Sequence, residues 1–189
     1  MPRSFQVRKG PQIHCQPTVA SSFSIVTDAS PWGLGGVLTH NGSPITYFSS
    51  PLVTADFRKF QAKAGEPKFM PIWEALAILV ALRAWTKFLS SNTEFMCKCD
   101  NLGVVFNQNK RSSKNPHVNI VLREIALHEC KVPGLVIRTS HVLGQANVWP
   151  DALSRLTAPE GHRKTLPAEI ASLKETTVSE RVKSWWLCQ

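Results

Sequence analysis

The first part of the chain contains short, largely apolar segments separated by polar and turn-forming residues, and these segments predict strands. Three such segments lie at residues 23–28, 33–39 and 44–49. The Asn41-Gly42 pair between the last two is a strong hairpin signal, because both residue types tolerate positive φ. We therefore expect three consecutive antiparallel strands.

Longer apolar runs with helical spacing follow. Pro71 suits the first turn of a helix over residues 71–89, because the missing N–H would be unused there. The remaining predicted elements are a strand at 94–99, helices at 101–109 and 117–130, a strand at 134–139 and a helix at 146–156. A meander followed by right-handed crossovers predicts an α/β fold. Its five-stranded mixed sheet has three antiparallel strands, then two parallel ones, with helices on its faces, and the fourth strand lies beside the first.

The ends of the chain differ from its middle. Residues 1–21 contain three prolines and no acid, and they predict an irregular basic arm. Residues 22–157 hold the predicted elements and form the expected domain. Residues 158–189 are predicted as a helical tail that binds a protein partner through Trp185 and Trp186. The longest apolar run, residues 75–82, is too short to span a membrane.

Charge favours a polyanionic partner. The chain carries a formal net charge of +9, and residues 28–157 contain 14 lysines and arginines but nine acids. A basic surface of this kind is typical of proteins that bind nucleic acid. Charge that serves solubility alone is the other interpretation.

The five cysteines are odd in number, and their spacing matches neither a zinc site nor a disulfide framework. They predict free thiols in a reducing, intracellular compartment. Nucleus, cytoplasm and organelle remain open.

Four acidic residues in separate contexts are the strongest chemical signal. Asp28, Glu74 and Asp100 follow or lie beside apolar runs, and Asp151 lies on the last predicted helix. An unpaired carboxylate is costly to bury in such places, whereas four of them gathered at one point would bind hard divalent cations. Taken singly, Asp100 could serve as a helix N-cap and Glu74 as a partner of the helix dipole.

The contexts of these acids resemble a known family. They read TDAS (27–30), WEALAILVAL (73–82), CDN (99–101) and NVWPDALSRL (147–156). In this order they are similar to the ribonuclease H domain of retroelement reverse transcriptases, over about residues 22–156. Leu102 stands where many cellular members have a glutamine.

The resemblance implies an RNase H-like fold and an endonuclease that cleaves the RNA strand of RNA–DNA hybrids by two-metal hydrolysis. It implies two Mg²⁺ ions, with Mn²⁺ as an alternative, held by Asp28, Glu74, Asp100 and Asp151. His141 resembles a histidine that assists product release; a polar residue at a strand end is the other interpretation. The residues expected to contact nucleic acid are Ala29, Ser30, Gly33, Asn101, Asn147, Lys110, Arg111 and Lys114.

Three other functions remain compatible with the sequence. The first is a domesticated, non-catalytic RNase H-like subunit that acts as a scaffold or nucleic-acid-binding part of a larger assembly. The second is a transposase or integrase, which is disfavoured by Glu74 on the first helix and Asp151 near the end. The third is a binder of single strands, which is disfavoured because aromatic residues are sparse in the basic stretches.

Overall fold

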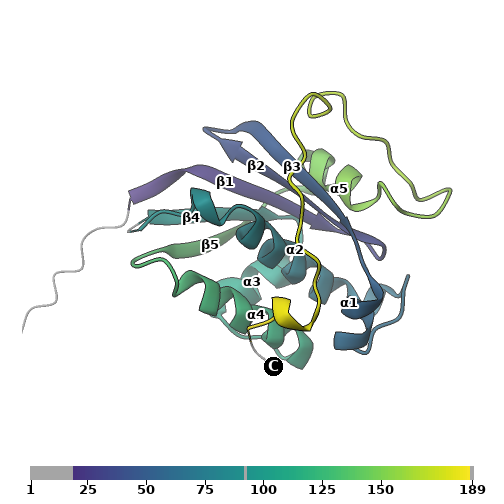
Figure 1. Ribbon diagram of the computed structural model, residues 1–189, viewed down its shortest axis with the longest axis horizontal. Coiled ribbons are helices and arrows are strands. Elements are labelled where there is room, and N and C mark those ends of the chain that lie inside the picture. The colour runs from purple at the N-terminus through teal and green to yellow at the C-terminus, as the bar shows by residue number, and fades with distance from the viewer. Residues whose placement is uncertain (1–18, 92, 188–189) are drawn as a thin grey trace, which may run out of the picture.

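The computed structural model describes residues 19–91 and 93–187. Its centre is one five-stranded sheet with the order β3-β2-β1-β4-β5 (Figure 1). The strands are β1 (Val19–Ala29), β2 (Gly33–His40), β3 (Ser43–Pro51), β4 (Thr93–Cys99) and β5 (Val136–His141). Most of the predicted basic arm lies outside the described residues.

The strand directions confirm the sequence prediction. β1 is antiparallel to β2 and parallel to β4, and β4 is parallel to β5. The hairpin between β2 and β3 turns at Asn41 and Gly42, whose φ angles are 50° and 84°. β4 lies beside β1, as expected from a right-handed crossover.

Five α-helices are present in the described part of the chain. They are α1 (Thr54–Lys59), α2 (Met70–Ala84), α3 (Leu102–Lys110), α4 (Pro116–Glu129) and α5 (Val148–Ser154). No helix was predicted for residues 54–59, where α1 forms. The long helix was expected to reach residue 89, but α2 ends at Ala84 and a short 3₁₀ turn follows. No helix among the described residues is both long and apolar enough to cross a membrane.

Helices cover both faces of the sheet. α2 packs against β1 and β2 on one face and is itself covered by α4, so nearly its whole circumference is buried. α5 packs on β1, β2 and β3. Because side chains alternate along a strand, Leu34 and Leu38 of β2 join the core under α2, whereas Val37 packs with Leu153 of α5.

Two glycines of β2 allow α5 to approach the sheet closely. A Cβ atom built on Gly35 would lie 2.3 Å from the carbonyl oxygen of Pro150, and one on Gly33 would lie 2.7 Å from that of Ser154. Any side chain here would therefore push α5 away. α5 is thus the element that lies against these glycines, and the expected contact of Gly33 with nucleic acid stays a prediction.

The tail after α5 differs from its prediction. Between residues 158 and 187 it contains no α-helix, only a 3₁₀ turn, Lys183–Trp185. It runs past β3 and ends over α2 and α4 (yellow in Figure 1), and Thr176 N–H donates to the carbonyl of Tyr47 at 2.7 Å. The expected helical tail is not observed: apart from this bond to β3, its backbone hydrogen bonds mostly close short turns, such as the one from Ile170 N–H to the Pro167 carbonyl.

Long-range side-chain contacts fasten the tail. Arg181 is buried and forms two hydrogen bonds with Asp56 of α1, at 2.9 and 2.8 Å. Trp186 is 5% exposed and packs edge-on against Phe60. Trp185 is half-buried beneath the guanidinium group of Arg83. The two tryptophans thus pack on this domain rather than forming the exposed surface we had expected.

Candidate metal centre

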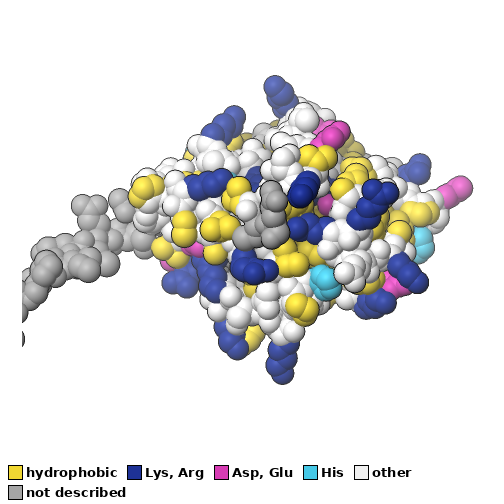
Figure 2. Space-filling model, turned by 60° about the horizontal axis from the view of Figure 1, so that its bottom comes forward, with side chains coloured by type: hydrophobic (Ala, Val, Ile, Leu, Met, Phe, Trp, Pro, Cys, Tyr) yellow, Lys and Arg dark blue, Asp and Glu magenta, His cyan; other side chains and the backbone are white. Residues whose placement is uncertain are grey.

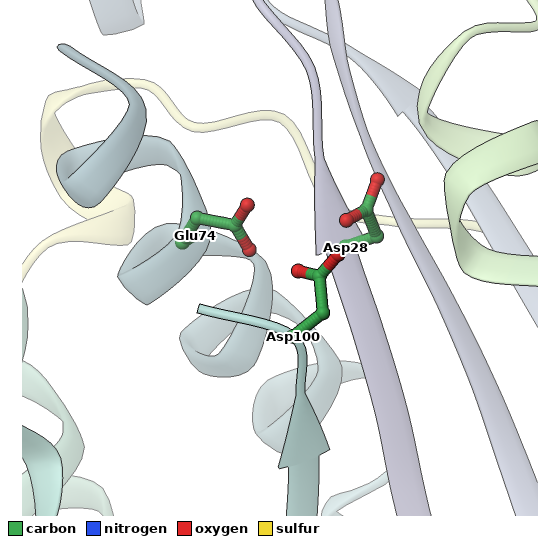
Figure 3. Close-up of side chains that lie close together, drawn as sticks. All are labelled: Asp28, Glu74 and Asp100. Carbon is green, nitrogen blue, oxygen red and sulfur yellow. The ribbon is translucent and has the colours of Figure 1, made fainter. Parts of the chain in front are cut away.

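Three of the four acidic residues converge. Asp28 lies near the end of β1, Glu74 in the second turn of α2, and Asp100 directly after β4. Each offers a carboxylate oxygen, and these three oxygens all lie within 4.8 Å of one another (Figure 3). The three side chains could therefore share one cation.

The sheet topology explains this convergence. β1 and β4 are parallel neighbours, and Ile25 pairs with Cys97 in their register. Their carboxyl ends therefore meet at one edge of the sheet, which brings Asp28 next to Asp100. α2 crosses β1 and delivers Glu74 from above the same edge.

Asp28 is held in place by α5 and its preceding loop. The Ser154 hydroxyl donates to Oδ2 of Asp28 at 2.9 Å, and the Asn147 amide donates to Oδ1 at 3.4 Å. Asp28 is 4% exposed. Burial, followed by the negative charge of Asp100, raises the pKa of Asp28 to about 7. The carboxylate is thus oriented but not neutralised.

The buried charge of Glu74 has even fewer stabilising partners than that of Asp28. Burial, and then the charges of Asp28 and Asp100, raise the pKa of Glu74 well above its ordinary value. Its Oε2 atom is buried and has no hydrogen-bond partner among the described residues. A buried carboxylate that has an unpartnered oxygen and lies beside two other carboxylates is in an environment that a hard cation stabilises. The donor set therefore fits Mg²⁺ or Mn²⁺.

Asp151 lies outside this group of three, and its role as a fourth metal ligand stays a prediction. Its Oδ1 accepts from Arg155, one helical turn later, at 2.8 Å, and its Oδ2 binds the ammonium group of Lys164. Burial acts to raise the pKa of Asp151, but these hydrogen bonds and charges outweigh it and hold the pKa below its ordinary value. Its charge still contributes to the raised pKa of Asp28, so the two carboxylates interact.

His141 lies at the rim of the cluster. It ends β5 opposite Cys99 in the parallel register, and its exposed imidazole Nε2 is 3.2 Å from the backbone carbonyl of Asp100. It is accessible from solvent and adjacent to an acid of the cluster. Both interpretations of this residue remain predictions.

Four residues expected to contact nucleic acid are buried instead. Asn147 is fully buried and donates to Asp28 and to the Thr27 carbonyl. Ser30 is also fully buried, and its hydroxyl donates to the carbonyl of Ser154 at 2.6 Å. Ala29 is buried in the core, and Gly33 lies under α5. These residues pack around the end of β1 that carries Asp28, and their contact with nucleic acid stays a prediction.

The other expected contacts lie at the surface around α3. The Asn101 side chain caps this helix by accepting from Val104 N–H at 3.1 Å. Exposed Lys110 and Lys114, together with Phe106, line an open hollow of about 460 Å³. Arg111 is tied to Glu129 and to the Ile137 carbonyl. Lys110 and Lys114 are thus available to an anion, whereas Arg111 mainly joins α3 to its neighbours.

The surface in Figure 2 carries many more Lys and Arg than Asp and Glu side chains, and these cations spread around the view rather than gathering at one spot. This distribution agrees with the charge of the sequence. It gives a polyanion several points of attachment.

Two residues that matter at the site were missed in the sequence. Ser154 lies three residues after Asp151 on α5, close to one helical turn, and this spacing could have identified it. Lys164 is separated from Asp151 by an irregular segment, and no sequence pattern marks it.

The sequence of this chain is similar to a known protein family. Residues 18–124 match the model of the RNase H-like domain found in reverse transcriptase. No curated protein matches the chain significantly.

Solved structures of similar fold include two of LC11-RNase H1, which was isolated from compost by a metagenomic approach. One of them aligns with a TM-score of 0.53 at 21% identity, covering 70% of this chain and 92% of that one. The other, a complex with an RNA/DNA hybrid, aligns with a TM-score of 0.54 at 19% identity, covering 69% and 92%.

RNase H1 from the halophilic archaeon Halobacterium salinarum aligns with a TM-score of 0.51 at 15% identity, covering 69% of this chain and 92% of its own. At these identities the likeness concerns the fold. The matched residues span more than half of the sequence and include β1 to β4 with Asp28, Glu74 and Asp100. The chain therefore belongs to the family of RNase H-like domains found in reverse transcriptase.

Proposed function

We propose that this chain is a metal-dependent endonuclease that cleaves the RNA strand of RNA–DNA hybrids. The observation that carries the proposal is the orphaned Glu74 oxygen within the Asp28–Glu74–Asp100 cluster. Like charges held this close are unfavourable unless a cation binds them. The RNase H-like fold and the hybrid bound by LC11-RNase H1 support the choice of substrate.

The four carboxylates would together hold two metal ions. Asp28, Glu74 and Asp100 would hold a divalent cation, Mg²⁺ or Mn²⁺, and Asp151 would complete the site for a second ion once it is free of Lys164. Bound divalent ions supply an activated water and stabilise the charge that develops on the phosphate. Ser154 and Asn147 fix the orientation of Asp28, so that its oxygens face the cluster without rearrangement.

The surroundings of the cluster supply substrate contacts. Lys110 and Lys114 offer charge to a phosphate backbone, and sequence-independent attachment of this kind suits a nuclease that reads the type of duplex. His141, exposed beside Asp100, is placed to assist release of the cleaved strand. The origin of the chain in a retroelement is part of the same proposal.

A second candidate is a non-catalytic RNase H-like subunit of a larger assembly. One observation favours it: Asp151 is neutralised by two cations of its own chain. In that case the chain would bind a hybrid but not cut it.

The test is cleavage of an RNA–DNA hybrid labelled on the RNA strand, in Mg²⁺, in Mn²⁺ and in EDTA. We expect the wild type to cut the hybrid only with metal, and to leave RNA–RNA and DNA–DNA duplexes intact. Asp28→Asn should lose cleavage, whereas Glu169→Gln, which removes an exposed acid of the tail, should retain it. Binding measured by fluorescence anisotropy separates the two candidates: tight binding without cleavage in either metal would establish the second.

A further inference from the structure

The segment that follows α5 turns back toward the metal centre. Residues 157–165, called the return segment here, bring Lys164 to the carboxylate of Asp151. Arg155, the other cation on this carboxylate, is the C-cap residue of α5, so its backbone stays one helical turn from Asp151. Lys164 is therefore the movable partner of Asp151.

Several contacts hold the return segment in this position. Ala158 is fully buried, and its carbonyl accepts from Arg163 at 3.0 Å. The Lys164 N–H donates to the carbonyl of Arg155 at 3.4 Å. The ring of His162 stacks on Trp32, with centroids 4.7 Å apart, and Trp32 lies in the turn that follows Asp28. The segment thus bridges α5 and the loop beside the metal centre.

The charges around the centre are unevenly compensated. Within the described residues no salt bridge joins a cation to Asp28, Glu74 or Asp100, whereas Asp151 forms two. The Lys164 side chain is half exposed, and that of Asp151 is 25% exposed. An ion pair this accessible is weak, so a divalent ion at sufficient concentration can displace the lysine.

We propose that Lys164 is an internal cation that holds the place of the second metal ion. The resting chain binds one divalent ion at Asp28, Glu74 and Asp100. A second ion reaches Asp151 only when the return segment releases Lys164. This inference rests on the proposed function, since it assumes that the inner cluster binds metal. It makes the return segment an inhibitory strap that competes with metal for the fourth carboxylate.

Mn²⁺ titration of the full chain, with free Mn²⁺ followed by electron paramagnetic resonance, tests the proposal. For the wild type we expect one ion bound tightly and a second bound more weakly. Lys164→Gln should tighten the second ion about threefold to tenfold, because one accessible ion pair no longer competes. Lys164→Arg should restore the wild-type value. Lys174→Gln, which removes another exposed lysine of the tail, should leave both constants unchanged.

Hydrogen exchange gives an independent readout. The amides of His162 and Lys164 donate to backbone carbonyls in the closed segment, so we expect their exchange to accelerate when the second ion binds. Addition of Asp151→Asn to the Lys164→Gln variant should abolish the second ion and leave the first.

The outcomes separate the two proposals. If the first ion binds but Lys164→Gln matches Lys174→Gln, the strap is refuted while the nuclease proposal stands. The strap is also refuted if the wild type binds two ions with equal affinity. If no ion binds and Asp28→Asn behaves as the wild type, the proposed metal centre is refuted, and the proposal of an inhibitory strap is refuted with it.

Discussion

Replacement of Asp28 by asparagine should stabilise the metal-free protein at neutral and alkaline pH. Asparagine keeps the shape of the side chain, and the Ser154 hydroxyl can still hydrogen-bond to its amide oxygen. It removes a buried negative charge that faces Glu74 and Asp100. In the absence of metal that charge opposes folding.

The size of the effect follows from the pKa of Asp28, which rises from an ordinary value of 3.8 to about 7. The folded chain therefore keeps a proton that the unfolded chain has released. The associated stability is fully present below about pH 4 and is lost as the pH rises to about 7. The difference between the two pKa values corresponds to about 4 kcal/mol. Because Glu74 shares the proton uptake, we expect a gain of about 1–3 kcal/mol for the variant at pH 8.

Urea unfolding in EDTA at pH 8 and at pH 5 measures this gain. The advantage of Asp28→Asn should shrink at pH 5, and Mg²⁺ should reverse it, because metal stabilises only a chain that binds it. Glu169→Gln provides the control and should change little at either pH. A variant that is no more stable than the wild type in EDTA at pH 8 would refute the electrostatic reasoning.

Two further perturbations test how the site is supported. Gly35→Ala places a Cβ atom against the Pro150 carbonyl and should cost about 1–3 kcal/mol of unfolding free energy; an unchanged melting temperature would show that α5 does not press on β2. Arg181→Leu leaves Asp56 buried without its cation and should cost about 3–5 kcal/mol in urea unfolding; a loss below about 1 kcal/mol would mean that the tail is not anchored there.

Much of the fold could be predicted because its signals are local. The Asn41-Gly42 turn fixes the hairpin, and the crossover through α2 places β4 beside β1. Once these strands are parallel neighbours, Asp28 and Asp100 must lie at one edge. The convergence of the inner carboxylates thus follows from sequence pattern and handedness rules.

The course of the tail, the packing of α5 and the pairing of Asp151 depend on contacts between distant residues, which leave no local sequence pattern. Asp56 and Arg181 are 125 positions apart, so the tail was expected to be helical and available to a partner. The glycines of β2 permit a close approach, but no sequence pattern says that α5 is the approaching element. Asp151 was expected in the metal cluster because nothing in the sequence indicates that Lys164 returns to it.

The central claim is that Asp28, Glu74 and Asp100 hold a divalent cation, and anomalous scattering from crystals grown with Mn²⁺ tests it most directly. We expect a manganese peak within coordination distance of all three carboxylates in the wild type, and its loss in Asp28→Asn crystals. A wild-type map with Glu74 Oε2 still without a partner, and no manganese at the cluster, would contradict the claim.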